Sequence, residues 1–235
     1  MTDHLRLCAI HQPNFFPWLG FFDKIRQADA FVFLDAVAYP RSGSKGMGSW
    51  TNRVRINVQG QPHWIGCPVL RQPLGAPISS ILIDGSQPWQ GKLLKTLEVN
   101  YRRAANFANG MALIEPLIRN AEGSLAEYNR FSIITIAGHL GLECHFLTQS
   151  ELDTSGAGTD LLIDLTRRAG CDGYLAGGGA GGYQQDSLFS DSGVELVYQN
   201  FRTRVYGPVD RFIPGLSVID YILHDGRPLA EAFPE

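Results

Sequence analysis

The sequence predicts an α/β fold in which a mostly parallel sheet is flanked by helices. Two observations carry this prediction. Short apolar runs alternate with helical patterns in the first and last parts of the chain. Polar loops containing glycine or proline follow several of these runs, as is typical of the carboxyl ends of parallel strands. The 235 residues suffice for a sizeable core.

The N-terminal stretch gives the clearest strand–loop–helix–strand order. Residues 5–10 form a short apolar run, and a polar loop punctuated by prolines follows it. A helical pattern covers 19–28, and a second apolar run covers 30–34 and stops at Asp35. Ligands of open parallel sheets bind where strands end and helices begin, so we expect a site at the loop after residue 10.

The middle of the chain has a different sequence pattern and is interpreted as an insertion at about 50–123. A glycine- and serine-rich loop leads into a β-hairpin whose strands are predicted at 52–58 and 63–69. A helical pattern then covers 89–119. Ser124 and Glu127 match a capping box that starts a new helix, with Gly141 as its terminator.

Strand and helix patterns alternate again after residue 143. Strands are predicted at 144–148, 173–176 and 194–199, and helices at 159–169, 186–191 and 216–224. Such alternation is typical of βαβ units. We therefore predict one Rossmann-like domain, residues 1–235, in which the insertion separates the two halves of the sheet.

Composition excludes several classes of protein. The net charge of −3 argues against a nucleic-acid binder that works through a basic face. No apolar run approaches the length of a membrane span, and no signal-like N-terminus is apparent. The four scattered cysteines form no CxxC pair, so we expect free thiols in a reducing cytoplasm and no structural metal site.

His11 and Asp35 are the candidate catalytic residues, because each follows one of the first two strands. If these strands are neighbours, the carboxylate could orient the imidazole for proton transfer or anion binding. The alternative is that His11 satisfies loop backbone and Asp35 begins a turn. Gln12 and Asn14 lie in the same loop and are candidate substrate-binding residues.

Asn52 and Arg53 are further candidates for substrate binding, since an arginine fork suits a carboxylate or phosphate. The competing interpretation is a solvated strand edge. Gly177, Gly178 and Gly179 follow the strand 173–176 and would let a ligand approach backbone amides, with Tyr183 just beyond.

The glycine run matches neither GxGxxG nor a P-loop, and no metal-ligand spacing or serine elbow occurs elsewhere. Asp186 is expected to be the N-cap of the next helix.

These residues resemble a known family. The segments HQPNFFPWLGFFDKI, ADAFVFLDAVAYPR, SWTNRVRI and HWIGCPV, and later LSVIDYILHDG, are similar to successive signatures of the WbqC-like family. The likeness covers nearly the whole chain in order. Two departures are the longer linker SGSKGMG and Ala38, where a glutamine is common in the family.

The resemblance implies a role in surface-polysaccharide or specialised-metabolite biosynthesis. We expect a transferase that moves an acyl or aminoacyl group onto an amine or hydroxyl, with His11 as general base. Its partners would be a small-molecule substrate and a donor that could be carrier-bound. A weaker likeness to nucleotidylyltransferase-like sheets keeps a nucleotide-dependent ligase or nucleotidyltransferase open, although Gly20 replaces the second histidine of their motif. A non-catalytic partner protein is the third alternative.

Overall fold

The computed structural model describes residues 4–40, 49–178, 184–202 and 204–232. Its centre is a sheet of five parallel strands in the order β5-β2-β1-β6-β7. These strands are β1 Leu7–His11, β2 Ala30–Phe33, β5 His145–Thr148, β6 Gly173–Ala176 and β7 Glu195–Tyr198. The predicted α/β, Rossmann-like architecture is confirmed.

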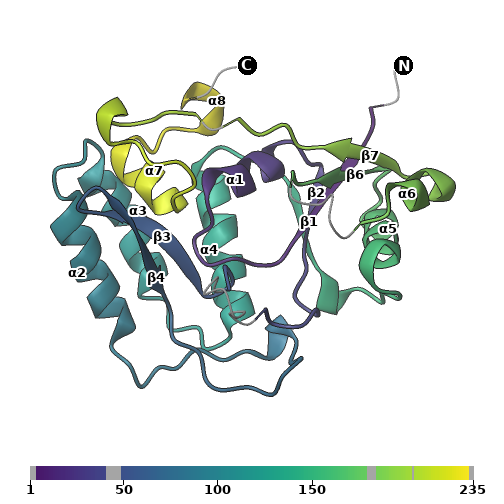
Figure 1. Ribbon diagram of the computed structural model, residues 1–235, viewed down its shortest axis with the longest axis horizontal. Coiled ribbons are helices and arrows are strands. Elements are labelled where there is room, and N and C mark those ends of the chain that lie inside the picture. The colour runs from purple at the N-terminus through teal and green to yellow at the C-terminus, as the bar shows by residue number, and fades with distance from the viewer. Residues whose placement is uncertain (1–3, 41–48, 179–183, 203, 233–235) are drawn as a thin grey trace.

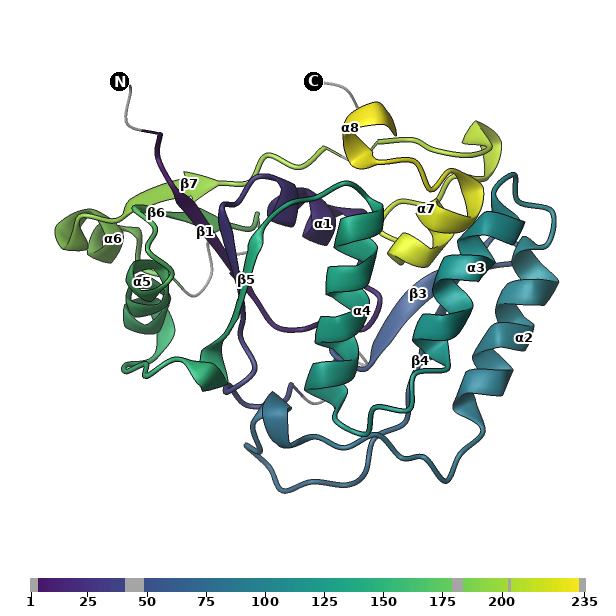
Figure 2. The same ribbon diagram turned by 180° about the vertical axis from the view of Figure 1, so that it is seen from behind.

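Helices cover both faces of this sheet (Figure 1). They include α1 Leu19–Arg26, α4 Leu125–His139, α5 Gly158–Arg168 and α6 Asp186–Ser192. Alternate strand residues point to opposite faces. Ala9 and Phe31 join the apolar cluster that contains α1 and α4, whereas Cys8 and Val32 join the cluster that contains α5. Figure 2 shows α4 and α5 on opposite sides of the strands.

The predicted insertion contains an antiparallel hairpin of β3 Arg53–Val58 and β4 Gln61–Gly66. The second strand begins two residues earlier than the pattern suggested. Gln59 and Gly60 both have positive φ, +53° and +81°, which gives a tight two-residue turn. Val54 and Ile56 on one face of the hairpin are fully buried.

The helical stretch 89–119 forms two helices, α2 Trp89–Tyr101 and α3 Phe107–Ile118. Ser124 caps α4 as predicted, because its hydroxyl accepts a hydrogen bond from the Glu127 amide. The reciprocal half of the box differs: the Ser124 amide donates to Glu122, while Glu127 pairs with Arg130. Short 3₁₀ turns occur at Ile78–Ser80, Gln149–Glu151 and Val209–Arg211.

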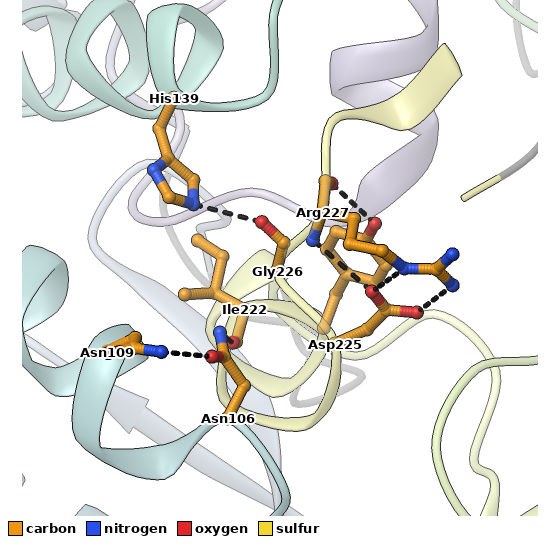
Figure 3. Close-up of polar contacts among 8 residues, drawn as sticks. Asn106, Asn109, His139, Ile222, Asp225, Gly226 and Arg227 are labelled. Carbon is orange, nitrogen blue, oxygen red and sulfur yellow. Dashed lines mark hydrogen bonds and ion pairs between the residues drawn. The ribbon is translucent and has the colours of Figure 1, made fainter. Parts of the chain in front are cut away.

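The chain ends on α7 Val218–His224 and α8 Leu229–Ala232, the second of which the sequence patterns did not indicate. A polar network closes the end of α7 (Figure 3). Asn106 donates to the Ile222 carbonyl, and His139 Nε2 lies 3.0 Å from the Gly226 carbonyl. This network fixes α7 against α3 and α4.

The described part of the chain contains no helix that is long and apolar enough to cross a membrane. Among the same residues, no group of three or more His, Cys, Asp or Glu side chains is arranged to hold a metal ion.

Candidate functional site

One pocket, the switch-point pocket, lies where the strand order of the sheet reverses. From the central β1, the chain adds β2 and β5 on one side and then β6 and β7 on the other. The carboxyl ends of β1 and β6 therefore leave a crevice, which is where such sheets bind ligands. A cavity of about 400 Å³ occupies this position. It is lined by Ile10, His11, Trp18, Gly20, Phe21, Lys24, Tyr174, Gly177, Gly178, Gln199 and Phe201.

His11 lines this pocket as predicted from its place after the first strand. Its Nδ1 lies 3.0 Å from the Gln12 carbonyl oxygen, and its ring packs edge-on against Phe21. Since a carbonyl oxygen only accepts, Nδ1 carries the proton of the neutral ring and Nε2 carries the lone pair. Burial, together with the charge of Lys24, lowers the pKa of His11 to about 4, so the imidazole is neutral near pH 7.

Lys24 is a pocket residue that sequence reasoning missed. Its side chain is 4% exposed, its Nζ donates to the Ile10 carbonyl at 3.1 Å, and it lies over the ring of Tyr174. Burial lowers its pKa to about 8, which leaves an ammonium group at neutral pH. The available signal was a lysine on the apolar face of α1, three residues after Phe21 and one before Ile25.

Asp35 does not pair with His11, which corrects the expected dyad. The two strands are neighbours, with His11 opposite Phe33. However, the carboxylate of Asp35 accepts hydrogen bonds from the Ser150 amide at 2.9 Å and the Ser150 hydroxyl at 2.6 Å. Asp35 is 2% exposed and joins the end of β2 to the turn after β5. Its geometry supports a structural role, and its predicted catalytic role gains no support.

The loop between His11 and Trp18 is held by several distant segments. The Phe15 amide donates to the Trp50 carbonyl, and Asn129 donates to the Pro13 carbonyl. Phe16 is fully buried at φ +38°, a backbone conformation that non-glycine residues rarely adopt. Such strain persists only where the surroundings enforce it, and it is often found at functional sites.

The loop candidates Gln12 and Asn14 have different positions. Gln12 contributes its carbonyl to His11 and is half-buried. Asn14 is 8% exposed, and its Oδ1 has no hydrogen-bond partner among the described residues. Neither lines the switch-point pocket, so both remain predictions as substrate-binding residues.

The hairpin candidates also lie apart from the lining of this pocket. Asn52 donates its side-chain amide to the Cys67 carbonyl and so closes the base of the hairpin. The Arg53 guanidinium lies over the ring of Trp64 at 4.6 Å. The Arg55 guanidinium lies 5.7 Å from the ring of Trp50 and 5.8 Å from the ring of Trp64. Asn52 therefore stabilises the hairpin through a hydrogen bond, and Arg53 makes a cation–π contact with Trp64.

Gly177 and Gly178 line the pocket after β6, as expected, and a Cβ at either would meet no atom within 4 Å. Gly179 and Tyr183 lie outside the described residues. Asp186 is the first residue of α6 and not its N-cap. Its carboxylate instead accepts a hydrogen bond from the Tyr198 hydroxyl at 2.7 Å.

Fold and pocket together define an α/β protein of the Rossmann-like type with a ligand crevice at its topological switch point. Residues 12–231 match the WbqC-like protein family, and the chain belongs to this family. It is 27% identical over 229 residues to the uncharacterized protein Rv1507c of Mycobacterium tuberculosis (strain ATCC 25618 / H37Rv), covering 94% of this chain and 95% of that protein. No solved structure matches the chain significantly. The family suggests a biosynthetic-pathway protein.

Proposed function

We propose that the protein is a biosynthetic transferase that moves an acyl or aminoacyl group onto an amine or hydroxyl in the switch-point pocket. One observation carries the proposal: a neutral imidazole, His11, and a buried ammonium group, Lys24, line the same cavity. Acyl transfer needs a base for the attacking nucleophile and a positive group for the oxyanion that forms.

Each residue has a definite role in this reaction. Nε2 of His11 accepts the proton of the attacking amine or hydroxyl as the new bond to the carbonyl carbon forms. The Lys24 ammonium stabilises the negative charge on the carbonyl oxygen. Backbone at Gly177 and Gly178 is open to close approach by the donor. The proton then passes from His11 to the departing group of the donor.

The first experiment identifies a donor by a thermal-shift screen of acyl donors, nucleotides and nucleotide sugars, because a ligand of the native state raises its melting temperature. Transfer from that donor to amine and hydroxyl acceptors is then followed by mass spectrometry. We expect His11→Ala to lower the transfer rate about 100-fold or more with an unchanged circular dichroism spectrum. The matched control is His63→Ala, since His63 is an exposed histidine on β4. Full activity in His11→Ala would exclude the proposed base.

A nucleotide-dependent ligase or nucleotidyltransferase is the second candidate. The observation in its favour is the place of the pocket, since nucleotides bind at this switch point in sheets of the same type. It predicts that ATP with magnesium raises the melting temperature of the wild-type protein. A screen in which acyl donors raise the melting temperature and no nucleotide does would favour the transferase.

A further inference from the structure

A second cavity, of about 580 Å³, lies at the end of the hairpin and outside the switch-point pocket. Four elements line it: the hairpin of β3 and β4 at its turn, the end of α2 with the two residues after it, the turn Val209–Arg211, and α7 through His224. Figure 1 and Figure 2 both place the hairpin turn and the end of α2 next to α7, on the side of α7 away from the central sheet. We propose that this cavity binds a small molecule that carries a phosphate or diphosphate group.

The charge of the cavity indicates an anionic ligand. Arg102, Arg103 and Arg211 all line it and are exposed. Within the described residues, no ion pair or hydrogen bond engages the guanidinium groups of Arg102 and Arg103, while Arg211 lies 3.7 Å from Asp210. Glu98, the acidic residue closest in sequence to this pair, is bonded to Lys95 at 2.8 Å and also interacts electrostatically with Arg102, but no acidic side chain is among the described residues that line the cavity. The cavity therefore holds an excess of positive charge.

The inner wall of the cavity contains Tyr101 and His224, and both side chains are hydrogen-bonded to Asp220. Asp220, 4% exposed behind the wall, accepts a hydrogen bond from the Tyr101 hydroxyl at 2.7 Å and another from Tyr206. Nδ1 of His224 lies 2.9 Å from the Asp220 carbonyl oxygen. This bond leaves Nε2 as the ring nitrogen available to a ligand. A phosphate hydroxyl can donate to it, as can a protonated phosphate ester.

The chemistry and size of the cavity favour phosphate over other anions. Arginine forks bind phosphate oxygens in pairs, and two consecutive arginines together with a third from another turn suit a group with several oxygens. Cavities of this volume hold small molecules. The amide side chains of Asn57 and Asn100 also line the wall and offer contacts for an uncharged part of the ligand.

The test measures binding of pyrophosphate to the full-length protein by isothermal titration calorimetry at low salt, without divalent metal. We expect saturable binding, and a loss of affinity of about 10-fold or more in the double variant Arg102→Gln/Arg103→Gln. The matched control is Arg167→Gln/Arg168→Gln, because these are also consecutive exposed arginines at the end of a helix: they lie in the last turn of α5, whereas Arg102 and Arg103 directly follow α2. Both double variants remove the same charge, so bulk electrostatics affects them equally.

Two further variants separate this site from the switch-point pocket. His11→Ala is expected to leave pyrophosphate affinity unchanged, whereas His224→Gln weakens it. Absence of saturable binding, equal losses in the two double-arginine variants, or loss of binding in His11→Ala would each overturn the proposal. Since the replaced arginines are exposed, we expect the double variants to keep the wild-type melting temperature, and this measurement checks that each variant is folded.

Discussion

Lys24 and His11 show how burial sets protonation at the level of single residues. Both side chains titrate below their ordinary values, mainly because the interior disfavours their charged forms. At neutral pH the result is a neutral imidazole, His11, in the same pocket as a charged ammonium group, Lys24. With their ordinary pKa values, both groups would be positively charged in weakly acidic solution. A site that separates acid and base roles in this way is suited to proton transfer.

Replacing Lys24 by methionine is expected to separate stability from function. At neutral pH the folded protein keeps a buried charge, which costs free energy that methionine of similar shape does not. We predict that Lys24→Met raises the free energy of unfolding by about 1 to 3 kcal/mol, less the lost hydrogen bond to Ile10, and lowers transfer activity. Urea denaturation at pH 7 measures the first effect. A variant less stable than wild type would show that the ammonium contributes net stability.

At the scale of the element, α1 and the residue before it form one wall of the pocket. The ring of Trp18 lies directly over Gly20, and a Cβ added there would stand 2.5 Å from Cζ2 of the indole. Phe201 contacts the same indole edge-on at 5.1 Å. Gly20 therefore leaves room for the Trp18 indole, although glycine has a low helix propensity.

Gly20→Ala is expected to move Trp18 away from the pocket. Alanine favours the helix by about 1 kcal/mol, but the indole must swing into solvent, so the net change in stability is small. We predict a red-shifted tryptophan emission and weaker binding of the donor found in the screen. Gly91→Ala on α2 is the control, because nothing lies within 4 Å of its added Cβ, and it should only stabilise. Unchanged emission and binding in Gly20→Ala would contradict this account of the wall.

The end of α7 depends on Gly226, which has φ +71° (Figure 3). A Cβ there would collide with the Asn106 amide and lie 2.9 Å from the Ile222 carbonyl. We predict that Gly226→Ala lowers the free energy of unfolding by about 2 to 4 kcal/mol, from the left-handed backbone and the collision together. Gly60→Ala, with a positive φ but open surroundings, should lose only about 1 kcal/mol. Equal losses in thermal or urea unfolding would exclude the collision.

For the molecule as a whole, the two depressed pKa values predict a pH dependence of stability. The unfolded chain binds more protons at His11 between pH 6.5 and about 4, so this contribution to stability is lost as the pH falls through that range. At Lys24 the same difference applies between about pH 8 and 10.5, where stability rises with pH. Unfolding by urea across both ranges, compared with His11→Gln and Lys24→Met, isolates each site. Parallel curves for wild type and variant would refute the corresponding shift.

Local patterns predicted most of the fold, because the hydrophobic periodicity of strands and helices, and caps such as Ser124, depend on residues that are close in sequence. The position of His11 at the edge of the sheet could also be predicted from the sequence, since a polar residue at a strand end marks that edge. The partner of Asp35 could not be predicted, because Ser150 lies 115 positions away and no local pattern links the two. Lys24 was missed because its environment depends on how α1 lies against β1 and β6.

The loop from His11 to Trp18 also bears on whether the protein can be divided. Its backbone is bonded to Trp50 before the hairpin, to Asn129 on α4, and to Ser217 and Val218 at the start of α7. A shortened chain that kept only the five parallel strands and the helices on their faces would retain the pocket residues and Asn129, but it would lose the bonds to Trp50, Ser217 and Val218. The pocket therefore depends on segments from several parts of the chain, and no fragment limited to the parallel sheet and its helices is expected to keep it intact.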